Sequence, residues 1–266
     1  MTAPPTEPLW SVIIPYFNEA DFIATPLASA CAQTGTTLRL ILVDNRSSDD
    51  TTARAREFLA AAPDLDVVYL REDKPGQNNA LAAGFAYVAA HPTAHTAFWD
   101  ADTHYPADYL AEAARLLSAP GVVVAQGIDV YDPPESPAGR RRRTRMVLTQ
   151  RLLSHQGHTG SYGQCFQTQA LARAGGPLSA NWPFVLYDHE LMQRIFKQGR
   201  GTGSRDLWCQ PSPRRSANAH VRWSLTERIL YHITPFAAKD WFFYTFLAGR
   251  FRARAMMQEN LRSRDW

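Results

Sequence analysis

Two aspartates, Asp100 and Asp102, stand one residue apart in the stretch AFWDADTHYP, directly after a short apolar run. Neighbouring carboxylates repel each other and are costly to remove from water, so such a pair is stable only at the surface or beside a cation. Mg²⁺ and Mn²⁺ prefer carboxylate oxygens and commonly share their remaining positions with substrate phosphates. The spacing therefore predicts a cation site for a diphosphate. The alternative is a solvated turn whose aspartate caps a helix expected from Pro106.

The chain around this pair alternates between short β-branched runs and helical patterns. The runs predict strands at residues 10–17, 38–45, 66–70, 96–99 and 121–130, and helices are expected between them, among others at 49–62, 78–90 and 106–117. Alternation of this kind indicates βαβ units with right-handed crossovers. We therefore expect an α/β fold with a Rossmann-like, mainly parallel sheet flanked by helices.

Acidic side chains follow three of the predicted strands at the point where each strand ends. Glu19 follows the first strand, Asp44 lies at the end of the second, and Asp100 and Asp102 follow the fourth. Ligands of open α/β sheets bind outside the carboxyl ends of the strands. The alternation alone thus predicts that these four carboxylates share one rim.

The second half of the chain has a different character. Proline, glycine and consecutive arginines, Arg140 to Arg143 with Arg145, predict a mobile basic loop over residues 131–145. From about Met146 the pattern is more helical, with helices expected near 188–199, 224–232 and 236–257.

Charge and cysteine content exclude several classes of protein. The chain has 28 Lys and Arg against 25 Asp and Glu, a balance too mild for a polyanion binder, and no aromatic residues interleave the arginine run, so we expect no nucleic-acid partner. Three cysteines without metal-ligand spacing argue against a disulfide framework and for a reducing cytoplasm. No secretory signal pattern opens the sequence.

An apolar run near the end of the sequence raises the question of a membrane. The run WFFYTFL, followed by Arg250, Arg252 and Arg254, is far shorter than the ~20 residues that span a bilayer. A peripheral contact of this C-terminal helix with the inner face of the membrane is one interpretation. Packing of the aromatic side chains against the sheet or in a homodimer is the other.

Four ordered segments closely resemble the nucleotide-sugar half of family 2 glycosyltransferases, which have the GT-A fold. These segments are SVIIPYFNEADFI, LILVDNRSSDDTTARA, GQNNALAAGFAYV and FWDADTHYPADYL. The later LYDHELMQRIFKQG resembles the acidic motif of the same family. The resemblance implies one merged GT-A domain, with a nucleotide-sugar-binding half at 1–130, the basic loop at 131–145, and an acceptor-binding half with C-terminal helices at 146–266.

The resemblance also assigns donor-binding residues. Pro15, Tyr16 and Glu19 match the loop that family members wrap around the nucleotide base and ribose, although an ordinary strand-to-helix turn would also explain them. Asp44 matches a carboxylate that accepts hydrogen bonds from the base or ribose, with a turn aspartate as the alternative. Gln77 stands where many relatives direct a basic residue toward the base. The identity of the base is therefore open, with a UDP-sugar favoured.

The same comparison assigns the metal ligands. Asp100 and Asp102 match the pair that binds the donor diphosphate through Mn²⁺ or Mg²⁺. His220 lies where many GT-A enzymes supply a late histidine to the cation.

Asp188 matches the general base that takes a proton from the acceptor hydroxyl, a role that suits an ionised carboxylate within reach of the nucleophile. Tyr187 replaces the acid that precedes it in the family motif. Glu190 is a rival base, but it lies four residues before Arg194 and is more simply an i,i+4 ion pair. A helix N-cap is the alternative role for Asp188.

These expectations combine into one predicted activity. The chain is expected to be an inverting, metal-dependent glycosyltransferase that moves a sugar from a nucleoside diphosphate sugar to a hydroxyl of a glycan, lipid or lipid-linked acceptor. A sugar-phosphate nucleotidylyltransferase or a non-catalytic nucleotide-sugar binder are the alternatives. The first of these lacks support, because no glycine-rich phosphate loop follows the first strand.

Overall fold

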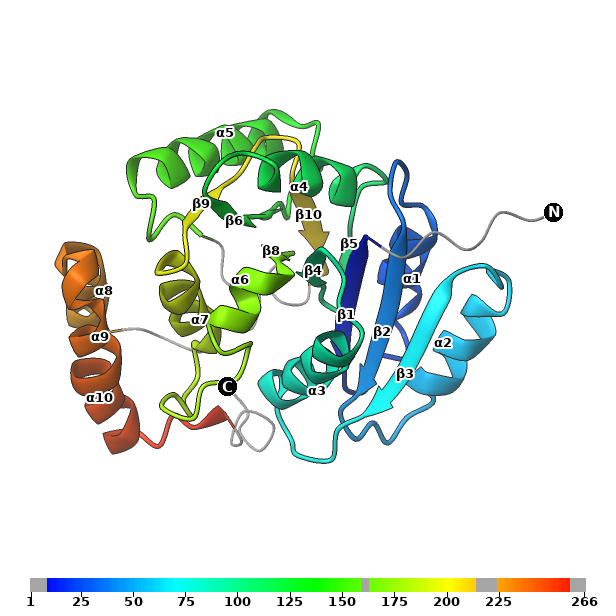
Figure 1. The fold of residues 1–266 in the computed structure, drawn as a ribbon, viewed down its shortest axis with the longest axis horizontal. Helices are drawn as coiled ribbons and strands as arrows, with labels where there is room; N and C mark the ends of the chain where they lie inside the picture. The colour runs from blue at the N-terminus through cyan, green and yellow to red at the C-terminus, as the bar shows by residue number, and fades with distance from the viewer. Residues whose placement is uncertain (1–8, 159–162, 214–223, 259–266) are drawn as a thin grey trace.

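A computed structural model describes residues 9–158, 163–213 and 224–258. Its centre is a seven-stranded sheet in the order β3-β2-β1-β4-β8-β6-β9, in which only β8 runs antiparallel to its neighbours (Figure 1). The strands are β1 (Trp10–Tyr16), β2 (Leu38–Asp44), β3 (Asp66–Arg71), β4 (His95–Phe98), β6 (Val122–Ala125), β8 (Cys165–Gln167) and β9 (Arg200–Thr202). The predicted mainly parallel α/β fold is confirmed.

The β-branched run of β1 is buried on both faces because helices cover both sides of the sheet. Successive side chains alternate between the faces, so Ile13 joins one hydrophobic cluster while Val12 and Ile14 join the other. The helices that contribute to the Val12 side are α1 (Ala24–Cys31), α2 (Thr51–Leu59) and α4 (Tyr109–Leu117); those on the Ile13 side are α3 (Gln77–Ala90), α6 (Thr168–Arg173) and α7 (Tyr187–Phe196).

Helix α3 approaches the sheet unusually closely at Gly84. A Cβ at this position would lie 2.5 Å from Cγ2 of Ile13, so only glycine fits between the helix and β1. This contact fixes the depth of α3, whose first residue, Gln77, begins at the carboxyl edge of the sheet.

A second, three-stranded sheet forms beside the first, in the order β5-β10-β7. It consists of β5 (Thr103–His104), β7 (Ile128–Asp129) and β10 (Trp208–Pro211). The strand expected over residues 121–130 is therefore two strands, because the chain leaves the large sheet after Ala125 and pairs with β10 from Ile128. This small sheet carries the chain that follows Asp102.

The predicted loop at 131–145 is wrong for its second half, which lies in helix α5 (Pro137–Leu152). Ser136 caps this helix by accepting a hydrogen bond from the amide of Gly139, and Pro137 occupies the first helical position, where its missing N–H costs nothing. Three of the arginines have partners: Arg140 donates to the carbonyl oxygen of Glu135, Arg142 pairs with Asp129, and Arg143 donates to the carbonyl oxygens of Arg205 and Pro134.

The C-terminal helices are α8 (Leu225–Ile233), η2 (Phe236–Ala238), α9 (Lys239–Trp241), η3 (Phe242–Leu247) and α10 (Ala248–Ala253). Of the two interpretations of the aromatic run, packing into the core is confirmed for Phe242, Phe243 and Leu247, which are buried in the cluster on the Ile13 side of the sheet. Arg250 and Arg254 instead bind the buried carboxylate of Glu227. Within the described part of the chain, no helix combines the length and apolarity needed to cross a bilayer.

Candidate functional site

Asp100 and Asp102 lie at the carboxyl end of β4, and both are almost completely buried. The turn that holds them rests on an aromatic stack in which the rings of Trp99 and Tyr105 lie 3.9 Å apart. The amide of Trp99 continues the pairing with β1 by donating to the carbonyl of Ile13, and the amide of Asp100 donates to the hydroxyl of Tyr105. The alternative of a solvated capping turn is wrong, because helix α4 begins only at Tyr109.

Each of the two carboxylates is positioned by a different element. Oδ1 of Asp100 accepts a hydrogen bond of 2.9 Å from Nε2 of Gln77, at the start of α3. Oδ1 of Asp102 accepts from the hydroxyl of Thr103, and its backbone carbonyl accepts from the amide of Ser212, next to β10. Gln77 and Asp100, both predicted donor-site residues, are therefore brought together.

Tyr16 of the predicted nucleotide loop and the predicted ligand Asp44 lie at the ends of two paired strands. Tyr16 and Asp44 are register neighbours of β1 and β2. The Tyr16 hydroxyl lies 2.9 Å from Oγ1 of Thr52, and burial raises the pKa of Tyr16. Oδ1 of Asp44 accepts from the amide of Ser47, three residues on, while its Oδ2 lies 3.8 Å from Nη1 of Arg71.

Glu19 lies on the same edge and is half-buried. Its amide donates a 2.8 Å hydrogen bond to Oγ1 of Thr51, which ties the loop after β1 to the start of α2. The four predicted donor residues of this loop region thus share one rim of the sheet with Asp100 and Asp102.

Sequence reasoning missed Asn45 and Arg71, which belong to this rim. Asn45 is buried, donates to the carbonyls of Glu72 and Lys74, and accepts from the amide of Gly76. It therefore fixes the loop that delivers Gln77. Its position directly after Asp44, at a strand end, was the available signal.

Asp188 is the second residue of α7 and lines a small cavity together with Phe98, the last residue of β4. It is not the N-cap, which is Leu186, and its Oδ1 accepts from the amide of His189. Asp188 thus approaches the end of β4 from a different element than Asp100 does. Its role as a base stays a prediction.

Glu190 is not a candidate for the general base, because its carboxylate is already occupied by other side chains. Its buried carboxylate receives two hydrogen bonds from Arg194, of 2.9 and 3.0 Å, and one from the hydroxyl of Tyr244. The predicted i,i+4 ion pair between Glu190 and Arg194 is confirmed. This pair fixes α7 and with it the orientation of Asp188.

Backbone strain marks the same edge. Of the described non-glycine residues, Asn18, Arg46, Leu186 and Ala255 have positive φ angles, and the first three lie within two residues of the predicted site residues Glu19, Asp44 and Asp188. Each such conformation costs on the order of 1–3 kcal/mol and persists where surrounding structure holds it, commonly at active sites. The strain is observed independently of the sequence motifs.

Behind Asp188 lies a buried group of titratable side chains that the sequence did not reveal. Nε2 of His158 lies 3.1 Å from the hydroxyl of Tyr231, and the rings of His158 and His189 are 4.5 Å apart. Burial lowers the pKa of both histidines, although the charge of Asp188 opposes this for His189. Burial and the Asp188 charge both raise the pKa of Tyr231.

The donor set fits a hard divalent cation in part. Two buried carboxylates are suitable ligands for Mn²⁺ or Mg²⁺ when substrate phosphates and further ligands complete the coordination. Among the described residues, no group of three His, Cys, Asp or Glu side chains could hold a metal ion. His220 lies outside the described residues, so its predicted role as a ligand is not tested.

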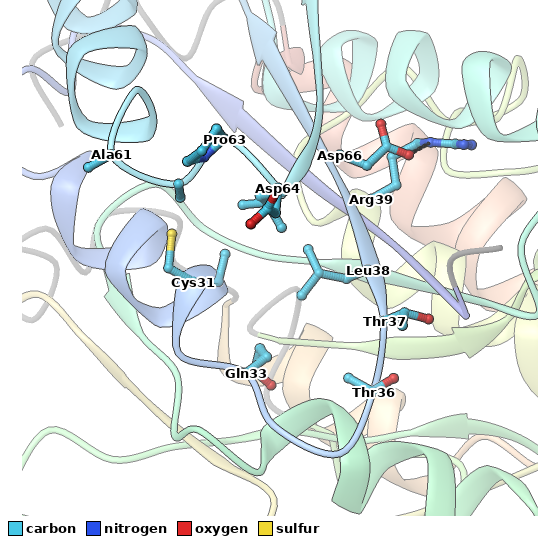
Figure 2. A pocket seen from close by; sticks show the side chains of 13 residues that line it. Cys31, Gln33, Thr36, Thr37, Leu38, Arg39, Ala61, Pro63, Asp64 and Asp66 are labelled. Atoms are coloured by element: carbon cyan, nitrogen blue, oxygen red, sulfur yellow. Dashed lines mark hydrogen bonds and ion pairs between the residues drawn. The ribbon is translucent and has the colours of Figure 1, made fainter. Parts of the chain in front are cut away.

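A groove of about 880 Å³ lies at the opposite, amino edge of the strands (Figure 2). Leu38 and Asp66, which line it, are the first residues of β2 and β3. Arg39 and Asp66 beside it form an ion pair of 2.7 Å. Because this groove lies at the wrong end of the sheet, it is not the candidate site despite its volume.

Comparison with known proteins agrees with this geometry. The family model described as glycosyl transferase family 2 matches residues 11–174, more than half of the chain. An undecaprenyl-phosphate 4-deoxy-4-formamido-L-arabinose transferase of Klebsiella pneumoniae is 35% identical over 91 residues, which are 33% of this chain and 28% of the relative. Glycosyltransferase AglE of Haloferax volcanii is 33% identical over 139 residues, 52% of this chain and 44% of that protein. The chain thus spans less than half of these curated relatives.

Solved structures share the fold. The mannosyltransferase PcManGT of Pyrobaculum calidifontis, in complex with GDP-Man and Mn²⁺, superposes with a TM-score of 0.67 at 23% identity, covering 88% of this chain and 64% of that one. S. aureus TarS in complex with UDP-GlcNAc superposes with a TM-score of 0.57 at 17% identity, covering 91% and 72%. With its GT-A fold and its family match, the chain belongs to glycosyl transferase family 2.

Proposed function

We propose that the protein is an inverting, metal-dependent glycosyltransferase that moves a sugar from a nucleoside diphosphate sugar to an acceptor hydroxyl. One observation carries this proposal: Asp100 and Asp102, directly after β4, and Asp188, in α7, lie at the same end of the sheet and come from two independent elements. The complexes of PcManGT with GDP-Man and Mn²⁺ and of TarS with UDP-GlcNAc support the donor class and the metal.

The donor would be held along the rim. The loops after β1 and β2, with Pro15, Tyr16, Glu19 and Asp44, would bind the base and ribose. Asp100 and Asp102 would hold Mn²⁺ or Mg²⁺, which when bound supplies positive charge to the departing diphosphate. Gln77 fixes the orientation of Asp100 before the donor arrives, so that no reorganisation is needed during the reaction.

Asp188 would act on the acceptor. As the acceptor oxygen attacks the anomeric carbon, its O–H bond breaks, the proton passes to the Asp188 carboxylate, and the bond between the sugar and the diphosphate breaks on the opposite face. Configuration at the anomeric carbon is therefore inverted. Holding the acceptor beside this base makes the attack effectively intramolecular.

We also propose a lipid or lipid-linked acceptor. The Klebsiella pneumoniae relative is named for transfer to undecaprenyl phosphate, which supports this class. An acceptor of this class could attack through either of two nucleophiles, a hydroxyl or a phosphate oxygen, and these remain to be distinguished.

The test is nucleotide release from a panel of UDP- and GDP-sugars in the presence of Mn²⁺ or Mg²⁺. We expect slow, metal-dependent release by the wild type and none by Asp102→Asn. Asp64→Asn is the matched control, because it removes an exposed carboxylate beside the groove at the opposite edge (Figure 2). Tight nucleotide binding without release by the wild type, whatever the acceptor, would establish a non-catalytic binder instead. Pyrophosphate formation from a sugar phosphate and a nucleoside triphosphate would indicate a nucleotidylyltransferase.

A further inference from the structure

Helix α8 exposes an apolar stripe. Leu225, Ile229 and Ile233, spaced four residues apart, are 74%, 49% and 66% exposed. The opposite side of the helix is the one that packs inward, since Glu227 and Tyr231 are buried there. The helix is therefore fixed by its inner face, and its outer aliphatic side chains contribute nothing to the core.

Helix α5 exposes a second stripe. Arg141, Arg145, Leu148 and Leu152 follow the spacing i, i+4, i+7 and i+11 and so share one face of the helix. Leu148 and Leu152 are 55% and 73% exposed. The two arginines line a groove of about 480 Å³ together with Arg142 and Asp132, and no carboxylate of the described residues forms an ion pair with either of the two. The stripe is thus basic toward the start of the helix and apolar toward its end.

The two stripes belong to neighbouring helices. Gln156 lies four residues beyond the end of α5 and makes two contacts with His232. Its Oε1 is 2.8 Å from Nδ1 of His232, and its Nε2 donates to the carbonyl oxygen of His232. His232 lies in the last turn of α8. Both helices reach the same side of the molecule (Figure 1). We call the two stripes together the α5–α8 face; its residues are Arg141, Arg145, Leu148, Leu152, Leu225, Ile229 and Ile233.

The charges around these apolar side chains identify the kind of partner. Helix α5 contains no acidic residue, and the one acid of α8, Glu227, is buried and bound by arginines. Arg151 and Arg228 add exposed positive charge beside the leucines and isoleucines. A second copy of the chain would place arginines against arginines, whereas an anionic lipid surface offers both phosphates for the arginines and acyl chains for the aliphatic residues.

We propose that the α5–α8 face docks the protein onto an anionic lipid bilayer. The aliphatic side chains enter the boundary between headgroups and acyl chains, and the arginines bind lipid phosphates. Docking would bring the enzyme to a lipid-linked acceptor in the plane of the membrane, and this part of the inference rests on the proposed function. The docking itself needs neither donor nor acceptor.

The experiment is flotation of the full chain with vesicles of phosphatidylcholine alone or with 30% phosphatidylglycerol, about a third of the lipid, at low and high salt. We expect binding to the anionic vesicles that weakens with salt. Ile229→Ser/Ile233→Ser and Leu148→Ser/Leu152→Ser should each weaken it at least about tenfold. Arg141→Gln/Arg145→Gln should weaken it about fivefold for each arginine, on anionic vesicles only.

Arg173→Gln/Leu178→Ser is the matched control, because it removes an exposed arginine and an exposed leucine outside the α5–α8 face. Wild-type affinity in the two serine variants overturns the proposal, as does a wild type that does not bind vesicles. Light scattering tests self-association. If the wild type is a dimer, and Ile229→Ser/Ile233→Ser dissociates this dimer without changing vesicle binding, the face is a self-association surface and the proposal is overturned as well.

The proposed function fails separately. Asp102→Asn should bind vesicles like the wild type, and the surface variants should release nucleotide from soluble donors at the wild-type rate. A wild type that releases no nucleotide from any donor but binds anionic vesicles would overturn the proposed function and support the docking surface.

Discussion

At the scale of single residues, Gln77 is the clearest positioning group. Its side-chain amide is the donor that orients the proposed metal ligand Asp100, and groups that orient metal ligands typically change metal affinity by about 10–100-fold when removed. We expect Gln77→Ala to raise the Mn²⁺ concentration needed for half-maximal nucleotide release by about tenfold. Titration of the rate with Mn²⁺ measures this.

Asn79→Ala is the control for that variant. Asn79 lies two residues after Gln77 on α3 and is half-buried, and among the bonds described its side chain donates only to the carbonyl of Pro75. An equal change of the Mn²⁺ requirement in both variants would mean that the effect comes from the helix terminus rather than from Asp100.

Asp188→Asn separates the two classes of acceptor. A hydroxyl nucleophile needs a base, so the variant should lose about 10²–10⁴ in kcat with such an acceptor while its nucleotide affinity stays unchanged. A lipid phosphate is already ionised near neutral pH, so transfer to it should fall much less. Rates with a lipid alcohol and a lipid phosphate of the same chain measure this difference. A loss of nucleotide affinity in the variant would instead place Asp188 in the donor site.

At the scale of elements, the sequence predicted most strands and helices of the first 120 residues, because β-branched runs and helical periodicity are local signals. The first part of helix α5, up to residue 145, is predicted as a loop because proline, glycine and consecutive like charges are typical of loops. The start signal was present in Ser136 and Pro137, but the partners that accommodate Arg142 and Arg143 come from distant parts of the chain. Strand β8 was missed because three residues carry no periodicity.

The cap of α5 can be tested directly. Ser136→Ala removes the acceptor for the amide of Gly139 and should lower the free energy of unfolding by about 1 kcal/mol. Urea denaturation measures this value. Ser154→Ala, at an exposed serine beyond the other end of the same helix, should change it by less than about 0.5 kcal/mol. Equal values for the two variants would contradict the assigned helix start.

Lys239 couples α9 to α8 and predicts a pH dependence. It is buried, its ammonium donates to the carbonyl of Tyr231, and burial lowers its pKa to about 8. The pKa of a lysine side chain in an unfolded chain is about 10.4. Between about pH 8 and 10.4 the unfolded chain therefore binds a proton that the folded chain does not, so this contribution to stability rises with pH and is constant below that window.

The free energy of unfolding of the wild type relative to Lys239→Met should accordingly increase from pH 8 to pH 10. Urea denaturation at several pH values measures it. Lys197→Met, at an exposed lysine paired with Asp240, should show no comparable increase. A difference between wild type and Lys239→Met that is independent of pH would show that Lys239 keeps its ordinary pKa in the folded state.

At the scale of the whole molecule, topology alone predicts the position of the candidate site. Parallel strands end on one edge, so Glu19, Asp44, Asp100 and Asp102 had to share it once the alternation was recognised. The group of side chains next to Asp188 could not be predicted in this way, because His158 and Tyr231 come from separate segments and meet each other and His189 only through packing of the second half. His220 remains a prediction.

Metal and nucleotide should stabilise the whole chain together. A ligand that binds only the folded state at 100 times its Kd adds about 2.7 kcal/mol to the free energy of unfolding. We expect UDP or GDP with Mn²⁺ to raise the melting temperature, and EDTA to remove the increase. Asp102→Asn should lose this increase and Asp64→Asn should keep it. A nucleotide effect of equal size in EDTA would contradict the proposed role of the carboxylate pair.

Strand β8 lies between β4 and β6, so these two strands of the first half have no hydrogen bonds with each other in the sheet. During synthesis, a nascent chain that has emerged only as far as β6 therefore exposes β4 as an edge strand with unpaired backbone groups. These groups find partners when Cys165–Gln167 leaves the ribosome and pairs with β4. The first 130 residues expressed alone should for this reason aggregate, and translation of the second half is a condition for solubility of the first.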